Sequence, residues 1–399
     1  MDGHDDMSQV TAQPELPSPV TVVIVDDSAT QRRFIRAAMA ADPLLEVVGE
    51  ARTGRDAVAL VERLQPTAVI MDLHLPVMNG IEAIERIMAN RPTPIVVYSA
   101  FVNGADRDNA ASALAAGAID VMAKPGPEDS ARLSEYAEEL RQRLRVAGRV
   151  RVITHPRGRL GVTRSSMTTA RLDGTTERPA PRSTSRRQPP PRPDEPSALM
   201  ESLAQREFEL LVIGASTGGP QALATLLADL PRRTDTAIVV VQHMADGFME
   251  GLTHWLDDVC PLPVVLGEHG KRIAPGAVTV APGGTNLVIH DHLRVTTSPP
   301  PPTQYHVPGI DVTFTSAAES YGSMAAGVLL TGMGRDGATG LKRIRDRGGL
   351  TIGQDESTSA VYGMPAAAKS EDAVDLQLPL PEISVALHRL LSPVDGGKV

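Results

Sequence analysis

Two groups of side chains on this chain have the types and spacing that catalysis requires, and they lie in different halves of the sequence. The first group collects charged residues at predicted strand ends: Asp26, Asp27, Asp72 and Lys124. The second group is centred on Ser216, with His243 and Asp336 further along the chain. The first suits phosphoryl transfer to a carboxylate, and the second suits acyl transfer through a serine. Together they predict a hydrolase that is switched by phosphorylation of its other half.

The acidic group predicts a magnesium site beside a phosphoacceptor. Carboxylates that meet at one sheet edge repel one another, and a divalent cation with oxygen ligands relieves that repulsion. We expect Asp26, Asp27 and Asp72 to hold Mg²⁺, which also neutralises an incoming phosphoryl group. Asp72 would then be the nucleophile, with Ser99 and Lys124 binding the phosphoryl oxygens. Each residue alone also fits a helix cap, a turn or a surface lysine, so it is their joint placement that favours a site.

Ser216 lies in the run Gly214–Gly219, between a predicted buried strand and a predicted helix. At such a helix start, free backbone N–H groups and the helix dipole can stabilise an oxyanion. Glycines there permit a tight turn and close approach of a substrate. The run also fits the G-x-S-x-G pattern of a nucleophile elbow. Turns of this composition also bind phosphates or cap helices, so the run alone leaves these readings open.

His243 follows the next strand along the chain, at the same sheet edge, and could act as the general base for Ser216. Asp336 follows a later apolar strand, where it could orient the imidazole of His243 or simply cap a helix. His306, in a proline-rich loop, is the rival histidine. The chain order Ser, His, Asp differs from that of α/β-hydrolases and indicates another fold with convergent chemistry.

Apolar strands alternate with helical segments through the first half of the chain. The predicted elements, in chain order, are 21–27, 28–41, 45–49, 54–65, 68–72, 80–90, 94–99, 105–116, 118–123 and 128–146. Strand–helix alternation predicts a parallel, doubly wound α/β sheet. Ligands of such sheets bind at the carboxyl ends of the strands, where the acidic group falls.

The same alternation resumes after a segment rich in Arg, Pro, Ser and Thr. Strands are predicted at 208–214, 237–242, 262–266, 277–281, 286–289 and 326–331, and helices at 219–229, 312–322 and 337–347. A second doubly wound α/β domain is therefore expected. The predicted division is a disordered tail over 1–19, a first domain over 20–147, a flexible linker over 148–205, a second domain over 206–392 and a tail over 393–399.

Composition excludes several classes of protein. A chain of 399 residues suits two domains, and a net charge of −9 argues against nucleic acid as the main partner. Cys260 is the single cysteine, so no internal disulfide can form and a cytoplasmic location is expected. The sequence around Cys260 favours a small packed residue over a nucleophile. No apolar run approaches the ~20 residues of a membrane span, so no membrane insertion is expected.

The first half resembles a two-component receiver domain. The resemblance covers residues 20–146 and is carried by Val25-Asp26-Asp27-Ser28, Met71-Asp72, Pro76, Asn79-Gly80, Ser99-Ala100 and Lys124-Pro125. It implies a flavodoxin-like fold, Mg²⁺ bound by Asp26, Asp27 and Asp72, and phosphorylation of Asp72 by a sensor histidine kinase. One departure is Val121, which stands where such domains usually carry a switch aromatic.

The second half resembles the catalytic domain of the CheB family of chemotaxis protein-glutamate methylesterases. The matching runs are Ile213–Gly219, Gln242-His243-Met244, Ala281–Gly284, Thr331–Gly337 and Tyr362–Pro365. The resemblance implies a Rossmann-like fold and a triad of Ser216, His243 and Asp336. It also implies an oxyanion region around Thr217 and Met333, with no cofactor for the esterase. The departures are Gly309-Ile310-Asp311 for a usual Ser-Val-Asp, Asn286 for a usual His, and a linker longer than usual.

These resemblances imply a phosphorylation-activated serine esterase. Its expected substrates are glutamyl methyl esters on methylated chemoreceptors, which it would hydrolyse to glutamate and methanol, and receptor glutamines, which it would deamidate. Two alternatives stay open. The chain could be an esterase of the same fold in another signalling pathway, such as surface motility. It could also be a receiver whose second domain only binds a partner or DNA.

Overall fold

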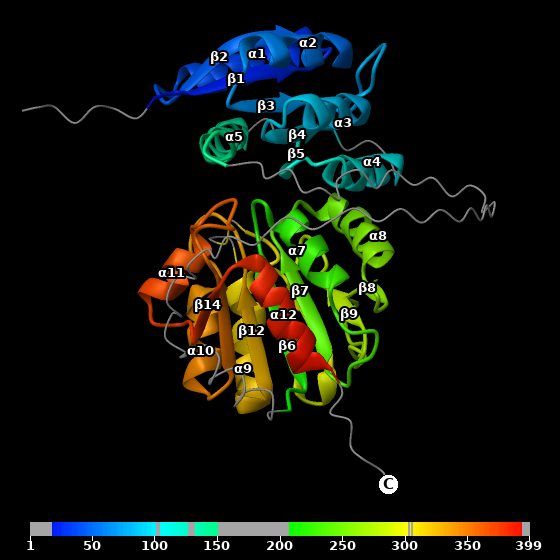
Figure 1. The fold of residues 1–399 in the computed structure, drawn as a ribbon, viewed down its shortest axis with the longest axis vertical. Coiled ribbons are helices and arrows are strands. Elements are labelled where there is room, and N and C mark those ends of the chain that lie inside the picture. Colours follow the sequence, from blue (N-terminus) through cyan, green and yellow to red (C-terminus); the bar gives the residue numbers. More distant parts are fainter. Residues whose placement is uncertain are drawn as a thin grey trace, which may run out of the picture.

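The computed structural model describes residues 18–100, 104–126, 132–150, 207–301, 304 and 306–392. These residues form two α/β domains, each built on its own parallel sheet (Figure 1). Most of the predicted N-terminal tail and linker, the predicted C-terminal tail and the start of the helix predicted from residue 128 lie outside the described residues. Within the described part, no helix is both long and apolar enough to pass through a membrane.

The first domain has a five-stranded parallel sheet in the order β2-β1-β3-β4-β5. Its strands are β1 (Val20–Val25), β2 (Leu45–Ala51), β3 (Ala68–Met71), β4 (Ile95–Ser99) and β5 (Asp120–Ala123). Its helices are α1 (Ala29–Ala40), α2 (Gly54–Leu64), α3 (Gly80–Asn90), α4 (Gly104–Ala115) and α5 (Leu133–Ala147). Residues of α2, α3 and α4 pack in one apolar cluster and residues of α1 and α5 in another, so the predicted doubly wound sheet is confirmed.

Local sequence explains where these helices begin. Ser28 caps α1, Thr53 caps α2 and Asn79 caps α3, and each side chain accepts a hydrogen bond from the backbone N–H three residues on. Strand β1 lies between two neighbours, and its residues 22–25 are buried, which suits a continuous apolar run rather than an alternating one. Asp26 and Asp27 therefore fall in the short loop between a buried strand and a capped helix.

The second domain has a seven-stranded sheet in the order β14-β13-β12-β6-β7-β9-β8, and every neighbouring pair is parallel. Its strands are β6 (Leu210–Ala215), β7 (Ala237–Gln242), β8 (Val264–Leu266), β9 (Val278–Val280), β12 (Ala325–Leu329), β13 (Leu350–Gln354) and β14 (Leu376–Leu378). Its α-helices are α7 (Gly219–Ala228), α8 (Met249–Val259), α9 (Ile310–Tyr321), α10 (Ala338–Asp346), α11 (Met364–Ser370) and α12 (Leu380–Leu391).

The second sheet differs in detail from the prediction. The strand predicted at 286–289 forms as β10 (Asn286–Ile289), but it pairs antiparallel with β11 (Val295–Ser298) in a hairpin outside the parallel sheet. Strands β11, β13 and β14 and helices α8, α11 and α12 were not predicted. The missed strands are three to five residues long, and such short apolar runs give a weak periodic signal.

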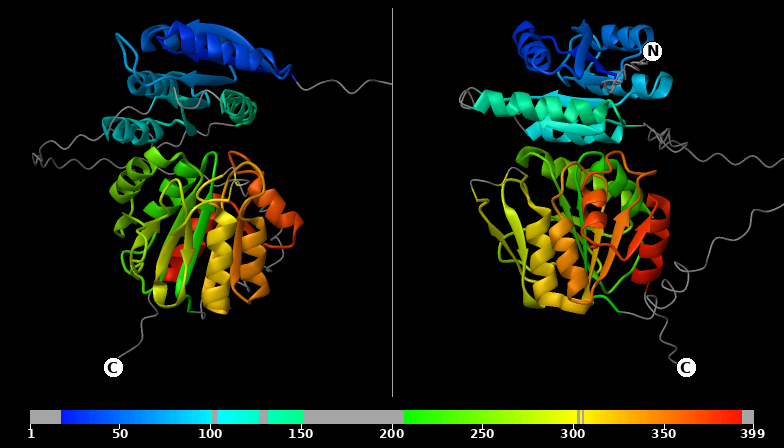
Figure 2. Two further views of the ribbon diagram at one scale, coloured as in Figure 1. Left: turned by 180° about the vertical axis from the view of Figure 1, so that it is seen from behind. Right: turned by 90° about the vertical axis from the view of Figure 1, so that its left-hand side faces the viewer.

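The two domains are in contact. The first domain lies across the end of the second sheet, with β5, α4 and α5 on the side nearer the second domain in the views of Figures 1 and 2. One backbone hydrogen bond runs from Gly218 N to Ile119 O over 3.2 Å. A second bond crosses from the side-chain amide of Gln221 in α7 to the carbonyl of Leu114 in α4. The first domain thus rests on the loop that carries Ser216.

Candidate active sites

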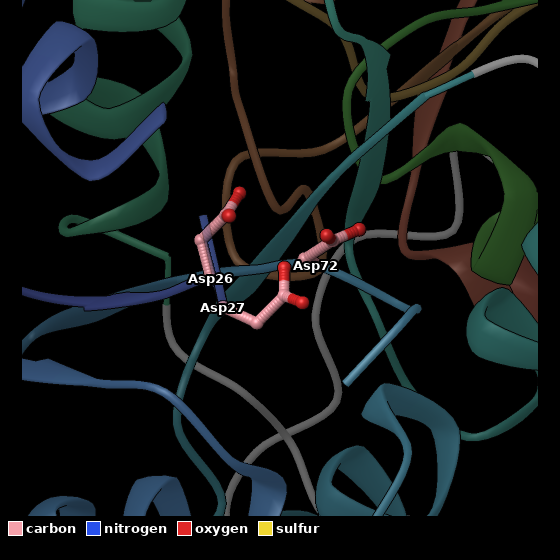
Figure 3. A group of neighbouring side chains, drawn as sticks. All are labelled: Asp26, Asp27 and Asp72. Atoms are coloured by element: carbon pink, nitrogen blue, oxygen red, sulfur yellow. The ribbon is translucent and has the colours of Figure 1, made fainter. Parts of the chain in front are cut away.

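The predicted acidic residues meet at one edge of the first sheet. Asp26 and Asp27 follow β1 and Asp72 follows β3, and one carboxylate oxygen of each lies within 4.8 Å of the others. Figure 3 shows the three side chains lying close together at neighbouring strand ends. Asp26 and Asp72 are buried, whereas Asp27 is exposed. The group is therefore open to solvent through Asp27.

Lys124 and Ser99 contact the same carboxylates. The Lys124 Nζ lies 2.7 Å from Asp26 Oδ2 and 2.6 Å from Asp72 Oδ2. The hydroxyl of Ser99 donates a hydrogen bond to Asp72 Oδ1 over 3.0 Å. The structure therefore brings together all five residues of the predicted phosphorylation site.

The charge balance of this site fits a divalent cation. Three carboxylates face one ammonium group, which leaves an excess of negative charge. Burial raises the pKa of Asp26 above its ordinary value, although Lys124 acts in the opposite direction. Oxygen ligands with excess negative charge are the kind that Mg²⁺ prefers. A cation bound here would hold Asp26 ionised.

Val121 occupies the position at which receiver domains usually carry a switch aromatic. It is buried in β5, with 1% of its surface exposed. An aromatic ring near Lys124 is supplied by Tyr98 in β4, whose ring centre lies 5.9 Å from Nζ. The Tyr98 hydroxyl is buried without a hydrogen-bond partner among the described residues, and burial raises its pKa.

Ser216 lies in the loop between β6 and α7, and 7% of the residue is exposed. Gly218 in this loop has a φ of +76°, a left-handed conformation that glycine adopts without strain. The backbone N–H of Ser216 donates to Thr331 O over 3.0 Å, and the Thr331 hydroxyl donates to Thr217 O over 3.0 Å. The serine loop is thereby tied to the segment that carries Asp336.

His243 and Asp336 are paired directly. The His243 Nε2 lies 2.7 Å from Asp336 Oδ2. The backbone N–H of His243 donates to Ala215 O over 3.0 Å, which fixes the histidine next to the end of β6. The other ring nitrogen, Nδ1, is buried and has no hydrogen-bond partner among the described residues. With Nε2 turned to the carboxylate, Nδ1 is the nitrogen available to accept a proton.

Asp336 pairs with His243 and also accepts backbone N–H groups at the start of α9, a helix that does not follow it directly in the sequence. Its Oδ2 accepts the Ile310 N–H over 2.8 Å, and its Oδ1 accepts the Asp311 N–H over 2.9 Å, at the start of α9. Burial acts to raise the pKa of Asp336, but the hydrogen bonds from His243 and these backbone groups hold the pKa below its ordinary value. Asp336 is therefore kept as a carboxylate.

The rival histidine, His306, lies against His243. The two rings are stacked, with 4.7 Å between their centres and an angle of 10° between their planes. His306 remains exposed as a residue, yet desolvation of its ring, with His243 beside it, lowers its pKa. His306 therefore lies against one face of His243 as a neutral ring, and it is His243 that contacts Asp336.

Two of the residues that depart from the usual family pattern, Asn286 and Gly309, are hydrogen-bonded to each other just before α9. The Asn286 Oδ1 accepts the Gly309 N–H over 2.7 Å, and the Asn286 side-chain amide donates to Gln304 Oε1 over 2.8 Å. Asp311 follows two residues later and accepts the Gly340 N–H over 2.6 Å. The Asn286 replacement thus supports the backbone from which α9 begins, and Asp311, which matches the usual pattern, joins α9 to α10.

Some residues at the serine site were missed by sequence reasoning. Asp120 of β5 accepts a hydrogen bond from the Thr217 hydroxyl over 3.3 Å and pairs with Arg143 of α5 over 2.7 Å. Gln242 is buried between the Ser216 and His243 backbones. Nothing local in the sequence marks Asp120, because its contact exists only when the domains dock. Met333 is half-buried in the loop that bears Asp336.

Cys260 ends helix α8 and is half-buried. Burial raises the pKa of its thiol, which disfavours the thiolate form that a nucleophile requires. This environment is consistent with the interpretation of Cys260 as a small packed residue rather than a nucleophile.

Comparison with known proteins places the chain in a family. The response regulator receiver domain matches residues 22–137, and CheB methylesterase matches residues 211–387. The chain is 40% identical to protein-glutamate methylesterase/protein-glutamine glutaminase 2 of Anaeromyxobacter dehalogenans, over 93% of this chain and 97% of that protein. It is 36% identical to the corresponding protein 4 of Myxococcus xanthus, over 92% of this chain and 96% of that protein.

Two solved structures are similar to separate parts of the chain. The CheB methylesterase catalytic domain of Thermotoga maritima is 36% identical and covers 47% of this chain and all of its own (TM-score 0.45). The response regulator domain of Thermotoga maritima CheB is 33% identical and covers 34% of this chain and 99% of its own (TM-score 0.31). With curated relatives aligned over nearly its whole length and both family models matched, the chain belongs to the CheB methylesterase family, in the form that carries a receiver domain.

Proposed function

We propose that this chain hydrolyses glutamyl methyl esters of chemoreceptors to glutamate and methanol, and that it deamidates receptor glutamines through the same serine. The observation that carries this proposal is the 2.7 Å pair between His243 and Asp336, next to a serine at the start of a helix. The relatives described above bear both activities in their names. We assign Ser216 as nucleophile, His243 as general base and Asp336 as the group that orients the base.

In the proposed reaction, Nδ1 of His243 takes the proton of Ser216 Oγ while this oxygen bonds to the ester carbonyl carbon. The carbonyl oxygen becomes an oxyanion at the start of α7, in the region of Thr217 and Met333, where backbone N–H groups stabilise it. The imidazolium, held through Nε2 by the Asp336 carboxylate, then gives its proton to the departing methoxide.

Methanol leaves, and the receptor glutamyl group remains as an ester of Ser216. Water then attacks this ester, with His243 again accepting a proton, and releases glutamate and the free serine. With a glutamine substrate, the same acyl-enzyme forms and ammonia is the leaving group. None of these steps requires a cofactor in the second domain.

We further propose that Asp72 accepts a phosphoryl group from a sensor histidine kinase. Asp26, Asp27 and Asp72 would hold Mg²⁺, which when bound neutralises charge on the phosphoryl oxygens. Ser99 and Lys124 already contact Asp72 and would bind those oxygens once the carboxylate is modified. A cytoplasmic location, in keeping with a chain that has one cysteine, remains part of the same proposal.

The contact between the domains supports control of the esterase by the receiver. Lys124, which pairs with Asp72, directly follows β5, and the other end of β5 carries Asp120, which contacts Thr217 beside the nucleophile. Phosphorylation of Asp72 would modify one of the two carboxylates that Lys124 contacts. It would therefore change the contacts of Lys124, which directly follows the strand that touches the serine loop. We propose that the docked receiver masks Ser216 and that phosphorylation weakens the docking.

Methanol release from methyl-labelled receptor membranes tests the proposed function. We expect the full-length chain, supplied with Mg²⁺ and a small phosphodonor, to release labelled methanol. The Ser216→Ala variant should lose activity by about a thousandfold or more. Ser384→Ala, which changes a buried serine of α12, is the matched control and should retain activity. Ser216→Ala activity above about a tenth of wild type contradicts the assignment of the nucleophile.

A further inference from the structure

Gln242 is the last residue of β7 and directly precedes His243. Only 1% of this residue is exposed. A polar side chain that is buried this deeply costs free energy unless it is hydrogen-bonded. The partners of its amide therefore indicate what the buried side chain does.

The Gln242 amide joins the two proposed catalytic residues. Its Nε2 donates one hydrogen bond to Ser216 O over 2.9 Å and another to His243 O over 3.0 Å. The Ser216 carbonyl also accepts the Gly219 N–H over 2.8 Å, at the first residue of α7. One planar amide thus connects the backbone of the nucleophile, the backbone of the base and the start of the helix.

The orientation of this amide is fixed by its surroundings. The Oε1 of Gln242 is buried and has no hydrogen-bond partner among the described residues. A Cβ on Gly219 would lie 2.2 Å from Oε1, so a larger residue at this position would force the amide to shift. The reverse orientation would turn Oε1 toward the carbonyl oxygens of Ser216 and His243, with repulsion in place of two hydrogen bonds. An unpaired acceptor is thus tolerated so that both donors can reach the catalytic backbone.

We propose that Gln242 is a positioning residue that sets the separation between the Ser216 hydroxyl and the His243 ring. It acts through the backbone of both residues and does not contact the substrate. The inference rests on the proposed function, because it presumes that Ser216 and His243 exchange a proton. Displacement of a catalytic group by about 1 Å can cost about a hundredfold in rate. Loss of the two hydrogen bonds should therefore lower kcat more than it changes KM.

A second buried glutamine differs from Gln242 in the groups that it joins. Gln354, at the end of β13, accepts the Thr331 N–H over 2.7 Å and donates to Thr358 O over 2.8 Å. Its amide is paired through both its oxygen and its nitrogen. Gln354 therefore supports the Thr331 segment, whereas Gln242 bridges the nucleophile and the base directly.

Substitution by methionine tests the role, because Gln242→Met keeps an unbranched side chain and removes both donors. The control is Thr236→Val, which removes a buried hydrogen bond to Phe208 O (2.7 Å) just before the opposite end of the same strand. In the full-length chain, activated with Mg²⁺ and a small phosphodonor, we expect kcat of Gln242→Met to fall about ten- to a hundredfold with KM within about twofold of wild type. Thr236→Val should keep kcat within about twofold. Equal kcat values for the two variants would overturn the proposal.

Gln242→Glu keeps the shape of the side chain and provides a second test if the methionine variant does not fold. A carboxylate has no donor, whereas a protonated carboxyl group has one. The kcat of this variant relative to wild type should rise as the pH falls from about 8 to about 6, with circular dichroism to confirm the fold. A ratio that stays flat over this range in folded protein also overturns the positioning role. Absence of methanol release by the wild type contradicts the proposed function instead.

Discussion

The carboxylates of Asp311 and Asp336 lie at the neighbouring starts of α9 and α10, and each accepts backbone N–H groups from the other helix. Asp336, just before α10, accepts the N–H groups of Ile310 and Asp311 in α9. Asp311 accepts the N–H of Gly340 in α10. A Cβ on Gly340 would lie 2.5 Å from the Phe314 Cβ, so the reciprocal caps depend on close approach of the two helices.

This arrangement makes stability depend on the protonation of Asp311. Burial, with a further contribution from Asp336, raises the pKa of Asp311 from 3.8 to about 6. The folded protein therefore binds this proton more tightly than the unfolded chain, and the free energy of unfolding should fall as the pH rises from about 4 to about 6. Asp311→Asn keeps an oxygen for Gly340 and removes the titration.

We expect Asp311→Asn to be more stable than wild type at about pH 8. At about pH 5, this difference in the free energy of unfolding should be smaller by about 1 kcal/mol. Thermal unfolding of both proteins at the two pH values measures the difference. A difference between the proteins that is the same at both pH values would show that Asp311 does not titrate in this range.

Asp72→Asn should abolish phosphorylation, because an amide cannot act as the nucleophile that a carboxylate is. A small phosphodonor with Mg²⁺ should then neither modify the protein nor raise methanol release above the basal rate. Asp42→Asn, at a buried aspartate of the same domain, is the control and should still be phosphorylated. Mass spectrometry of the intact protein detects the phosphoryl group, and its presence on Asp72→Asn would mean that another residue accepts it.

Asp120→Ala should raise the basal esterase rate by about two- to tenfold without a phosphodonor, because it removes a hydrogen bond to Thr217 that holds the domains together. The fully phosphorylated enzyme should be unchanged. Asp42→Ala breaks an aspartate–arginine pair within the first domain, with Arg145 at 2.8 Å, and should leave the basal rate as it is. Equal basal rates for the two variants would count against masking through Asp120.

His306→Ala should lower kcat by about two- to tenfold, because the stacked ring that restrains His243 is lost. His306→Phe retains a ring without a titratable group and should preserve most of the rate. Both variants are compared with wild type at a pH near 8 by methanol release. Activity of His306→Phe as low as that of His306→Ala would indicate a role for the imidazole nitrogens themselves.

The fold was accessible from the sequence because its signals are local. Continuous apolar runs such as β1 and β6 indicate strands buried on both faces, and caps such as Ser28 mark helix starts. Since parallel strands end at one edge, the residues that follow them could be expected to gather, as Asp26 and Asp72 do. The hairpin of β10 and β11 was not predicted, because an apolar run does not indicate which strand it will pair with.

The details of the candidate site depend on contacts that no local pattern carries. His306 lies in a proline-rich loop, and its stacking on His243 follows from the path of that loop in space. Asp120 looks like an ordinary residue of β5 until the domains dock. Gln242 stands in a recognisable run beside His243, but the two carbonyls that its amide bridges belong to loops that meet only in the folded domain.

The hydrogen bond from Gly218 to Ile119 has a consequence for how the two halves respond to each other. In the proposed function, a receptor glutamyl group must reach the loop that the receiver covers, so receptor and docked receiver would exclude one another there. Linked equilibria are reciprocal, so whatever binds the uncovered loop must also favour the receiver state that releases it. A high local density of receptors would then shift the docking equilibrium toward the undocked receiver. The basal activity of the enzyme would then depend on the amount of its substrate as well as on phosphorylation.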